Sequence, residues 1–274
     1  MTSAHRAVLW SGLRSAMWAG AMLATTGLLA QPEPVRELSR QGPNVKLGTT
    51  RFCLTLEPTG TIRDVRVGET QLISFIALYT TPTSPETGQG VRGCQAETPG
   101  LGDRPPQMDV TCSDGGAQVV ITRVCSHPQV LDNAPLWRLC ETVRLSPRGE
   151  LDLRYQCRFD RLLRWGGFSL ATALTMDAVR GRALAAYLPG LTVPGEAPGS
   201  LPGRDQTREL MGARVETSAG PLALWLGGTG RVDVQDWTQY LTFLAAPGAM
   251  PHGGMTMYRD TECRLSAALR LPVK

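Results

Sequence analysis

The segment from Leu136 to Phe159 constrains the fold more than any other part of the chain. Apolar and polar residues alternate on both sides of the turn Ser146–Glu150, which is the period of a β-strand. The turn length sets Leu145 opposite Leu151, so that the apolar faces of the two strands coincide. These faces carry Trp137, Leu139, Val143 and Leu145 on the first strand and Leu151, Leu153, Tyr155, Cys157 and Phe159 on the second. The segment predicts an antiparallel hairpin with one face in a core.

Similar short runs recur along the chain, between turns rich in glycine and proline. The 274 residues include 30 glycines and 20 prolines, well above the usual share, without a Gly-X-Y period. Strands are expected at 52–56, 62–67, 72–79, 108–112, 118–125, 168–176, 182–188, 213–217, 222–226, 232–237, 240–244 and 262–271. No stretch of 12 residues keeps a helical period with caps. The sequence therefore predicts an all-β chain, a large antiparallel β-sandwich with little helix and long loops at 80–107, 188–203 and 247–254.

The N-terminus resembles an export signal. Arg6 and Arg14 precede an uncharged stretch, Ser15–Ala30, whose apolar part is short for a membrane-spanning helix. Cleavage after Ala30 would leave a periplasmic or secreted protein; an uncleaved anchor is the alternative. We expect a signal peptide over 1–30, a polar N-terminal leader over 31–47 and a single β-sandwich domain over 48–274.

All seven cysteines follow this segment, and at least twelve residues separate successive ones. Disulfides are their default use in an exported chain, although Cys53 and Cys157 could equally be buried thiols. We expect one to three bridges, with Cys94 in one of them. The odd number leaves at least one thiol free or paired between chains. Without a CxxC motif, zinc or thioredoxin-like redox chemistry has little support, and we predict no metal and no cofactor.

The charge of the chain argues against two classes of partner. The formal net charge of +4 falls to +2 when the signal segment, with two arginines and no acid, is removed. No segment concentrates basic residues as a nucleic-acid surface would. We therefore expect no nucleic-acid partner, and no membrane contact after cleavage.

Three residues are candidates for catalysis. His127 and His252 lie at a strand end and in a glycine-rich loop, where an imidazole can act as a general base or can simply be solvated. Glu141 falls on the apolar face of the first hairpin strand, opposite Tyr155. A carboxylate in a core must be paired, hydrogen-bonded or protonated, so Glu141 is either a catalytic acid or base, or a buried carboxylate bonded to Tyr155 or to an arginine.

The polar face of the same hairpin supplies the candidates for ligand binding. Arg138 and Arg158 should be cross-strand neighbours, with Arg154 two residues along, and such like charges need an anion or acidic neighbours. Guanidinium groups suit the carboxylate of an acidic sugar, whereas Asp152 and Asp160 would suffice on a merely solvated face. Two tryptophans, Trp165 and Trp237, could stack on sugar rings. The regular strand patterns around Trp137 and Trp225 instead predict core positions.

The opening pattern has a family likeness. The run Phe52-Cys-Leu-Thr-Leu-Glu-Pro-Thr-Gly-Thr-Ile, followed by Val65-Arg-Val-Gly and Leu72-Ile, resembles the first strands of galactose-mutarotase-like β-supersandwiches. The hairpin from Leu145 to Tyr155 is similar to their central strands, and together these segments cover about a third of the mature chain. The resemblance implies carbohydrate as the ligand class. The Asn-His and Tyr-Phe signature of the epimerases is absent, so no catalytic residue is carried over.

These observations lead to one functional hypothesis and two alternatives. The first is an exported carbohydrate-binding protein without catalysis. The second is a carbohydrate-active enzyme, similar to an aldose epimerase or a polysaccharide lyase, that uses His127, His252 or Glu141. The third is a structural or protein-interaction component of the cell envelope.

Overall fold

The computed structural model describes residues 31–83, 106–125, 135–188, 191–196, 212–225, 229–236, 239–247 and 255–273. Residues Pro32–Lys274 form one compact unit. The described part of this unit is built from strands and one helical turn, α1 (Met176–Val179). It contains no helix of the length and apolarity that a bilayer crossing requires.

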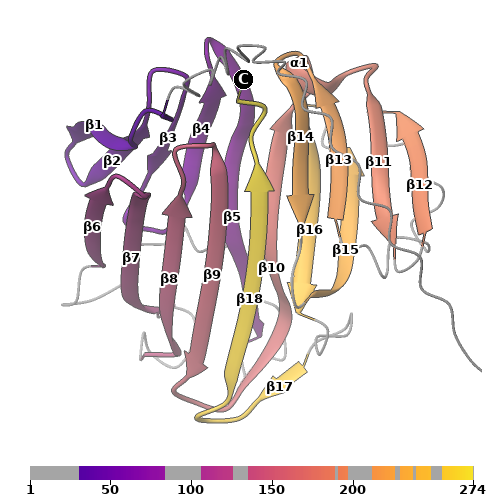
Figure 1. Cartoon of the computed structure of the whole chain (residues 1–274). Helices are drawn as coiled ribbons and strands as arrows, with labels where there is room; N and C mark the ends of the chain where they lie inside the picture. Colours follow the sequence, from indigo (N-terminus) through magenta and orange to yellow (C-terminus); the bar gives the residue numbers. More distant parts are fainter. Residues whose placement is uncertain are drawn as a thin grey trace, which may run out of the picture. The chain divides into compact units, whose positions relative to one another are not determined.

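The first sheet contains the five strands of residues 36–83 and four strands from later in the chain. Its order is β1-β2-β3-β4-β5-β10-β16-β15, with the short β17 also paired to β10 (Figure 1). The bounds are β1 Arg36–Gln41, β2 Asn44–Gly48, β3 Phe52–Leu56, β4 Ile62–Val67, β5 Thr70–Thr83, β10 Leu163–Thr175, β15 Thr229–Asp236, β16 Tyr240–Pro247 and β17 Met255–Met257.

The second sheet lies in front of the first in Figure 1, in the order β12-β11-β13-β14-β18-β9-β8-β7-β6. The bounds are β6 Gln107–Ser113, β7 Gly116–Cys125, β8 Trp137–Leu145, β9 Glu150–Phe159, β11 Ala183–Leu188, β12 Leu191–Glu196, β13 Gly212–Thr217, β14 Gly220–Trp225 and β18 Glu262–Arg270. Its centre joins strands that are far apart in sequence, because the last strand, β18, pairs with β9.

The main core lies between the facing sides of the two sheets. Every second residue of β9 from Leu151 to Phe159 is buried, and β3 and β8 alternate in the same way. Phe52 and Phe243 of the first sheet and Phe159 of the second are among the largest fully buried side chains. Strand pairing is antiparallel throughout the described sheets. The predicted large antiparallel β-sandwich with little helix is confirmed.

The predicted hairpin is present with the predicted register. Leu145 pairs with Leu151, and Glu141 pairs with Tyr155. The turn closes through the Gly149 N–H, which donates to the carbonyl of Ser146 at 3.0 Å. Gly149 has φ +75°, which a residue with a side chain adopts only with strain.

Three expectations about loops and leaders need correction. The polar segment expected as a leader, 31–47, contains β1 and most of β2, which extend the first sheet beyond β3. Every residue of β1 is exposed, so the alternation that would indicate a strand is absent. The loop expected over 188–203 contains β12, and β5 continues past residue 80. The signal segment 1–30 and most of the other two loop predictions lie outside the described residues.

Candidate functional site

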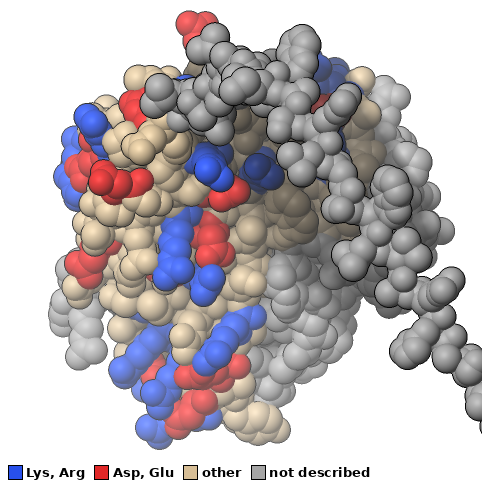
Figure 2. Space-filling model, viewed as in Figure 1, with Lys and Arg blue, Asp and Glu red and all other residues tan. Residues whose placement is uncertain are grey.

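The outward side of the second sheet carries a lattice of polar side chains, called here the outer face. It is defined on β8, β9 and β18 by four rows of register partners. From one end to the other, the rows are Arg138, Arg158 and Glu262; Cys140, Gln156 and Arg264; Thr142, Arg154 and Ser266; and Arg144, Asp152 and Ala268. Figure 2 shows the basic and acidic side chains interspersed over β6–β9 and β18.

Each predicted binding arginine on the outer face has a carboxylate partner. Arg138 and Arg158 are direct cross-strand neighbours, as predicted. The Arg138 Nε lies 3.2 Å from Asp160, and the Arg158 Nη2 lies 2.7 Å from Asp260. Aspartates thus relieve the repulsion between the two guanidinium groups. The prediction that Asp160 is such a neighbour is confirmed, whereas Asp260, in a turn 102 residues from Arg158, was not predicted.

Arg154 follows the same pattern within one strand. Its Nη2 lies 3.0 Å from Asp152, two residues before it on β9. The arginine side chain remains 61% exposed. Asp152 therefore partners Arg154, as expected for a solvated face, without covering it.

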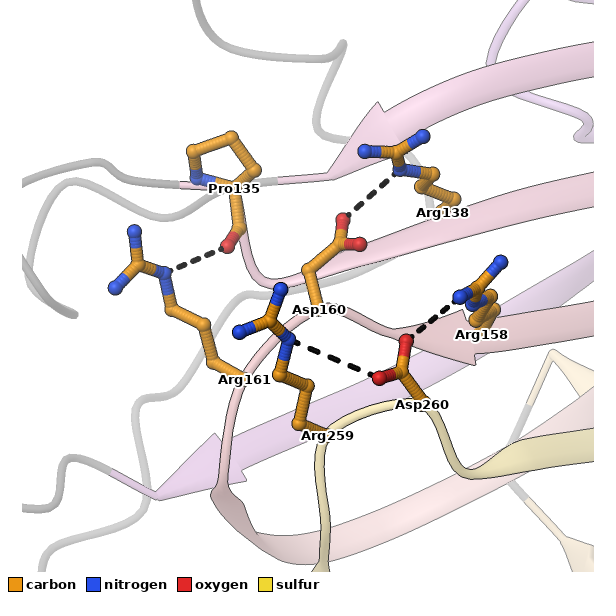
Figure 3. A network of polar contacts seen from close by, with 7 residues as sticks. All are labelled: Pro135, Arg138, Arg158, Asp160, Arg161, Arg259 and Asp260. Carbon is orange, nitrogen blue, oxygen red and sulfur yellow. Dashed lines mark hydrogen bonds and ion pairs between the residues drawn. The ribbon is translucent and has the colours of Figure 1, made fainter.

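Basic groups outnumber acidic ones at the end of the outer face where Arg138 lies. Figure 3 shows Arg138 and Arg158 beside Asp160 and Asp260, with two further arginines in the adjoining turns. One of these, Arg259, lies 3.8 Å from Asp260. The other, Arg161, donates to the carbonyl oxygen of Pro135. The network drawn in Figure 3 contains four arginines and two aspartates, and Glu262, in the same row as Arg138 and Arg158, is paired with Arg264. The arginines remain in excess, which favours an anionic ligand.

The hydrogen bond between Arg158 and Asp260 shifts both groups toward their charged forms. It raises the pKa of the Arg158 guanidinium, and it lowers the pKa of the Asp260 carboxyl. Both residues are therefore ionised at neutral pH, and the outer face is charged when a ligand arrives.

Two adjoining depressions open on the outer face. One, of about 600 Å³, contains Arg154 and Arg264; the other, of about 500 Å³, contains Arg138 and Arg158. The first is lined by Cys140, Thr142, Asp152, Arg154, Tyr155, Gln156, Arg264, Leu265 and Ser266. The second is lined by Gln107, Thr122, Arg123, Val124, Arg138, Leu139, Cys140, Gln156, Arg158 and Glu262. They adjoin because Cys140 and Gln156 line both, so the three predicted arginines face one continuous hollowed surface.

Glu141 lies on the opposite side of the same sheet, in the core. Its Oε1 accepts a hydrogen bond of 2.6 Å from Arg123 Nη2, and the two side chains are 1% and 0% exposed. Among the described residues, Glu141 Oε2 and the Tyr155 hydroxyl have no hydrogen-bond partner. Burial raises the pKa of the Glu141 carboxyl, and the charge of Arg123 opposes part of that rise. The interpretation of Glu141 as a buried carboxylate bonded to an arginine agrees with this geometry.

The sequence and the structure were compared with those of known proteins. No family model and no curated protein matches the sequence. Galactose 1-epimerase from Lactobacillus acidophilus NCFM is similar in structure with a TM-score of 0.51 and 9% identity, over 86% of this chain and 97% of that one. The fold is that of the galactose-mutarotase-like β-sandwiches.

Two other solved structures align with lower scores. A galactose mutarotase related enzyme from Lactobacillus acidophilus has a TM-score of 0.49 and 7% identity, over 83% of this chain and 96% of that one. An aldose epimerase homologue from C. elegans has a TM-score of 0.46 and 9% identity, over 80% of this chain and 95% of that one. At these identities the likeness extends to the fold alone.

The sequence predicted core positions for two tryptophans, and the structure places only one of them in the core. Trp137 is buried, as predicted, but Trp225 is 46% exposed, so the prediction of a core position for Trp225 is wrong. Leu222 and Leu224 point into the core, and the period of two therefore turns Trp225 outward. Its register partner is Ala268 on the outer face. Trp165 belongs to β10 of the first sheet, and Trp237, His127 and His252 lie outside the described residues.

No disulfide joins the described cysteines in this structure: Cys53, Cys112, Cys125, Cys140, Cys157 and Cys263. Cys94, expected in a bridge, lies outside the described residues. Cys157 is fully buried, in line with the alternative of a core thiol, whereas Cys53 is only half-buried. Within the described ranges, no three histidine, cysteine or acidic residues cluster as metal ligands would.

Proposed function

We propose that this protein is an exported carbohydrate-binding protein, without catalysis, that holds an acidic sugar on the outer face of its second sheet. The observation that carries the proposal is the pair of adjoining depressions that contain Arg138, Arg154, Arg158 and Arg264. Arginine binds carboxylates in a planar, bidentate geometry, which suits a uronate or another acidic sugar.

The aspartate partners leave the arginines able to bind a ligand. A guanidinium group has five N–H donors. Arg138 contacts Asp160 through Nε, and Arg158 contacts Asp260 through Nη2. The remaining donors of these exposed side chains can reach a ligand. The aspartates hold the guanidinium groups in place, which reduces the entropy that a ligand must remove.

Trp225 supplies the apolar surface that sugar rings commonly require. It lies on β14, and Arg154 lies on β9, on opposite sides of β18. Between them, β18 presents only the small side chains Ser266 and Ala268. Two strand spacings put the backbones of β14 and β9 about 10 Å apart. Trp225 shares its row with Ala268 and Asp152, and Arg154 lies in the next row, with Ser266. A sugar lying diagonally over β18 would therefore meet an aromatic ring at one end and a guanidinium group at the other.

The fold agrees with carbohydrate as the ligand class, because the similar structure with a TM-score above 0.5 is a galactose 1-epimerase. The likeness is not an argument for epimerase activity here. Glu141, the one candidate catalytic residue within the described ranges, is paired with Arg123 in the core.

Binding to matched oligosaccharides tests the proposal. Isothermal titration calorimetry would compare uronate oligosaccharides with neutral oligosaccharides of the same linkage. We expect binding of the acidic series, with an affinity that falls as salt is raised. Arg154→Ala should weaken it more than tenfold, because a charge-assisted hydrogen bond contributes roughly 1.5–3 kcal/mol. Trp225→Ala should also weaken it, by removing the stacking surface.

Arg214→Ala is the matched control. Arg214 is exposed on the same sheet and pairs with Glu216 two residues along, as Arg154 pairs with Asp152. It lines neither depression. Equal affinity in Arg154→Ala and wild type would show that Arg154 and the outer face do not bind the sugar. Equal losses of affinity in Arg154→Ala and Arg214→Ala would show that only the net charge of the protein matters.

Export has its own test. N-terminal sequencing of protein secreted from a bacterial host should begin near Gln31. A chain that retains Met1 in the cytoplasm would contradict the export part of the proposal and leave the binding surface to be judged separately.

A further inference from the structure

We propose that Cys157 and Cys263 form a disulfide that joins β9 to β18 across the centre of the second sheet. The proposal concerns the inner side of this sheet and does not depend on the sugar site. It specifies which thiols pair, which the cysteine spacing alone leaves open.

The register places the two residues directly opposite each other. Cys263 of β18 pairs with Cys157 of β9, in an unbroken antiparallel ladder that runs from Glu262 to Arg270. Cys157 shares its face with the buried residues Tyr155 and Phe159, and Cys263 shares its face with the buried Leu265. Both side chains therefore point to the inner side of the sheet. Of the other described cysteines, none has a cysteine as its register partner.

The backbone hydrogen bonds give the spacing of this pair. The Phe159 N–H donates to the carbonyl of Thr261, its opposite residue in the continued ladder. Hydrogen-bonded pairs recur every two residues, so the pair of Cys157 and Cys263 is also of this type. Opposite Cα atoms in such pairs lie about 5.5 Å apart, and disulfides usually span about 4.4–6.8 Å. The Cβ atoms of hydrogen-bonded pairs lie at the far end of about 4.5–5.5 Å, and a disulfide needs about 3.5–4.5 Å. The bridge therefore needs rotation of the two side chains and a local approach of β9 and β18.

The two thiols differ in exposure in a way that suits stepwise oxidation. Cys157 is fully buried, whereas Cys263 is half-buried and is the one a small oxidant reaches first. Burial raises the pKa of both thiols, so in the reduced protein both are protonated at neutral pH.

The reaction is a thiol–disulfide exchange with a small disulfide such as oxidised glutathione. Cys263 gives its proton to water, and the thiolate attacks one sulfur of the oxidant. The S–S bond of the oxidant breaks and releases one glutathione thiolate, which takes up a proton. Cys157 then attacks the Cys263 sulfur of the mixed disulfide and displaces the second glutathione thiol. Two protein thiols are oxidised, and one glutathione disulfide is reduced to two thiols.

Refolding in a glutathione redox buffer, followed by alkylation and peptide mapping, tests the proposal. Trypsin should release Tyr155–Arg158 and Asp260–Arg264, each with one cysteine. We expect these two peptides to be joined in the non-reduced digest and separate after reduction. The oxidised protein should also unfold at a higher urea concentration than the reduced protein, because the bridge restricts the unfolded chain.

Three variants complete the test. Cys263→Ser and Cys157→Ala should each abolish the linked peptide and the urea shift. Cys140→Ser, on the outer face of the same sheet, should preserve both. Refolded wild type in which both thiols are alkylated, or in which Cys157 is joined to a different cysteine, would overturn the proposal.

Discussion

Two arginine–carboxylate pairs on opposite sides of the second sheet make the most informative comparison in this molecule. Arg123 and Glu141 meet at 2.6 Å in the core, with side chains that are 0% and 1% exposed. Arg154 and Asp152 meet at 3.0 Å on the outer face, with side chains that are 61% and 36% exposed. The chemistry is the same, and only the surrounding medium differs.

The difference separates a structural role from a binding role. In the core, both charges have lost their water, so removing either one deprives the other of its contact at 2.6 Å. On the outer face, water competes with the aspartate, so the pair contributes little to folding. For the same reason, Arg154 can form contacts with a ligand at little cost to the fold.

The largest expected effect is therefore on stability, at Glu141. Glu141→Ala should lower the free energy of unfolding by about 3–5 kcal/mol, because the buried Arg123 loses the carboxylate that it contacts at 2.6 Å. Asp152→Ala should lower it by about 1 kcal/mol or less. Urea denaturation measures both. Similar losses in the two variants would show that the two pairs do not differ as proposed.

A double substitution sharpens this result. In Arg123→Met/Glu141→Leu both buried charges are replaced by apolar groups of similar size. We expect it to be more stable than Glu141→Ala, because no unpaired charge remains. A double variant that is less stable than Glu141→Ala would mean that the pair contributes more than it costs to bury.

The next effect concerns the turn that packs against the buried pair. Gly60, between β3 and β4, has φ +80°, and a Cβ there would overlap the Glu141 carboxylate. Gly68 also has a positive φ, +57°, but open space around it. Gly68→Ala should cost about 1–2 kcal/mol for the backbone alone. Gly60→Ala should cost more, because it also displaces a buried charge.

The excess cost at Gly60 depends on Glu141. In a Glu141→Ala background, the carboxylate is gone, and Gly60→Ala should cost about as much as Gly68→Ala. Urea denaturation of wild type, Gly60→Ala, Glu141→Ala and the double variant measures this coupling. An excess that persists without Glu141 would have another origin than the contact with the carboxylate.

The sequence predicted the register of the β8–β9 hairpin better than the partners of its charged side chains. Local alternation and a short turn determine the β8–β9 register, so the pairing of Arg138 with Arg158 and of Glu141 with Tyr155 could be predicted. The partner of Glu141 was predicted only as Tyr155 or an unspecified arginine, although a signal for Arg123 is present. Arg123 falls on the same period-two face as Ile121 and Cys125, which places an arginine in the core.

Other features depend on contacts between distant segments. The pairing of β9 with β18 joins residues about 100 positions apart, and no local pattern indicates it. It brings Asp260 to Arg158 and Cys263 to Cys157, and it sets Trp225 in the same row as Ala268 and Asp152. The sequence could therefore predict the part of the outer face on the β8–β9 hairpin, but not the part on β18. Trp225 itself could have been placed correctly from the inward Leu222 and Leu224.

A smaller effect concerns ligand geometry on the outer face. Arg154→Lys keeps the charge but loses the planar group of donors, so it should recover only part of the affinity that Arg154→Ala loses. The free energy of unfolding should change by less than about 0.5 kcal/mol, as is usual at exposed positions. Calorimetric titration with the uronate series measures the affinity. Full recovery in Arg154→Lys would indicate that charge alone, and not bidentate geometry, selects the sugar.

The smallest effect is the titration of Asp260. Its hydrogen bond to Arg158 lowers the pKa of the carboxyl below the ordinary value of 3.8, and the charge of Arg259 contributes less. The folded-state pKa is below the unfolded-state pKa, so the pair stabilises the fold fully at a pH above the unfolded-state pKa. This contribution is lost as the pH falls through the folded-state pKa. Carboxyl-carbon NMR should find a midpoint below 3.8 in wild type. Arg158→Gln should return it toward 3.8, and Arg259→Gln, which removes a contact at 3.8 Å, should move it less. An Asp260 midpoint that is the same in wild type and Arg158→Gln would show that water screens even this 2.7 Å contact, and that exposed pairs on this face do not hold their arginines in place for a ligand.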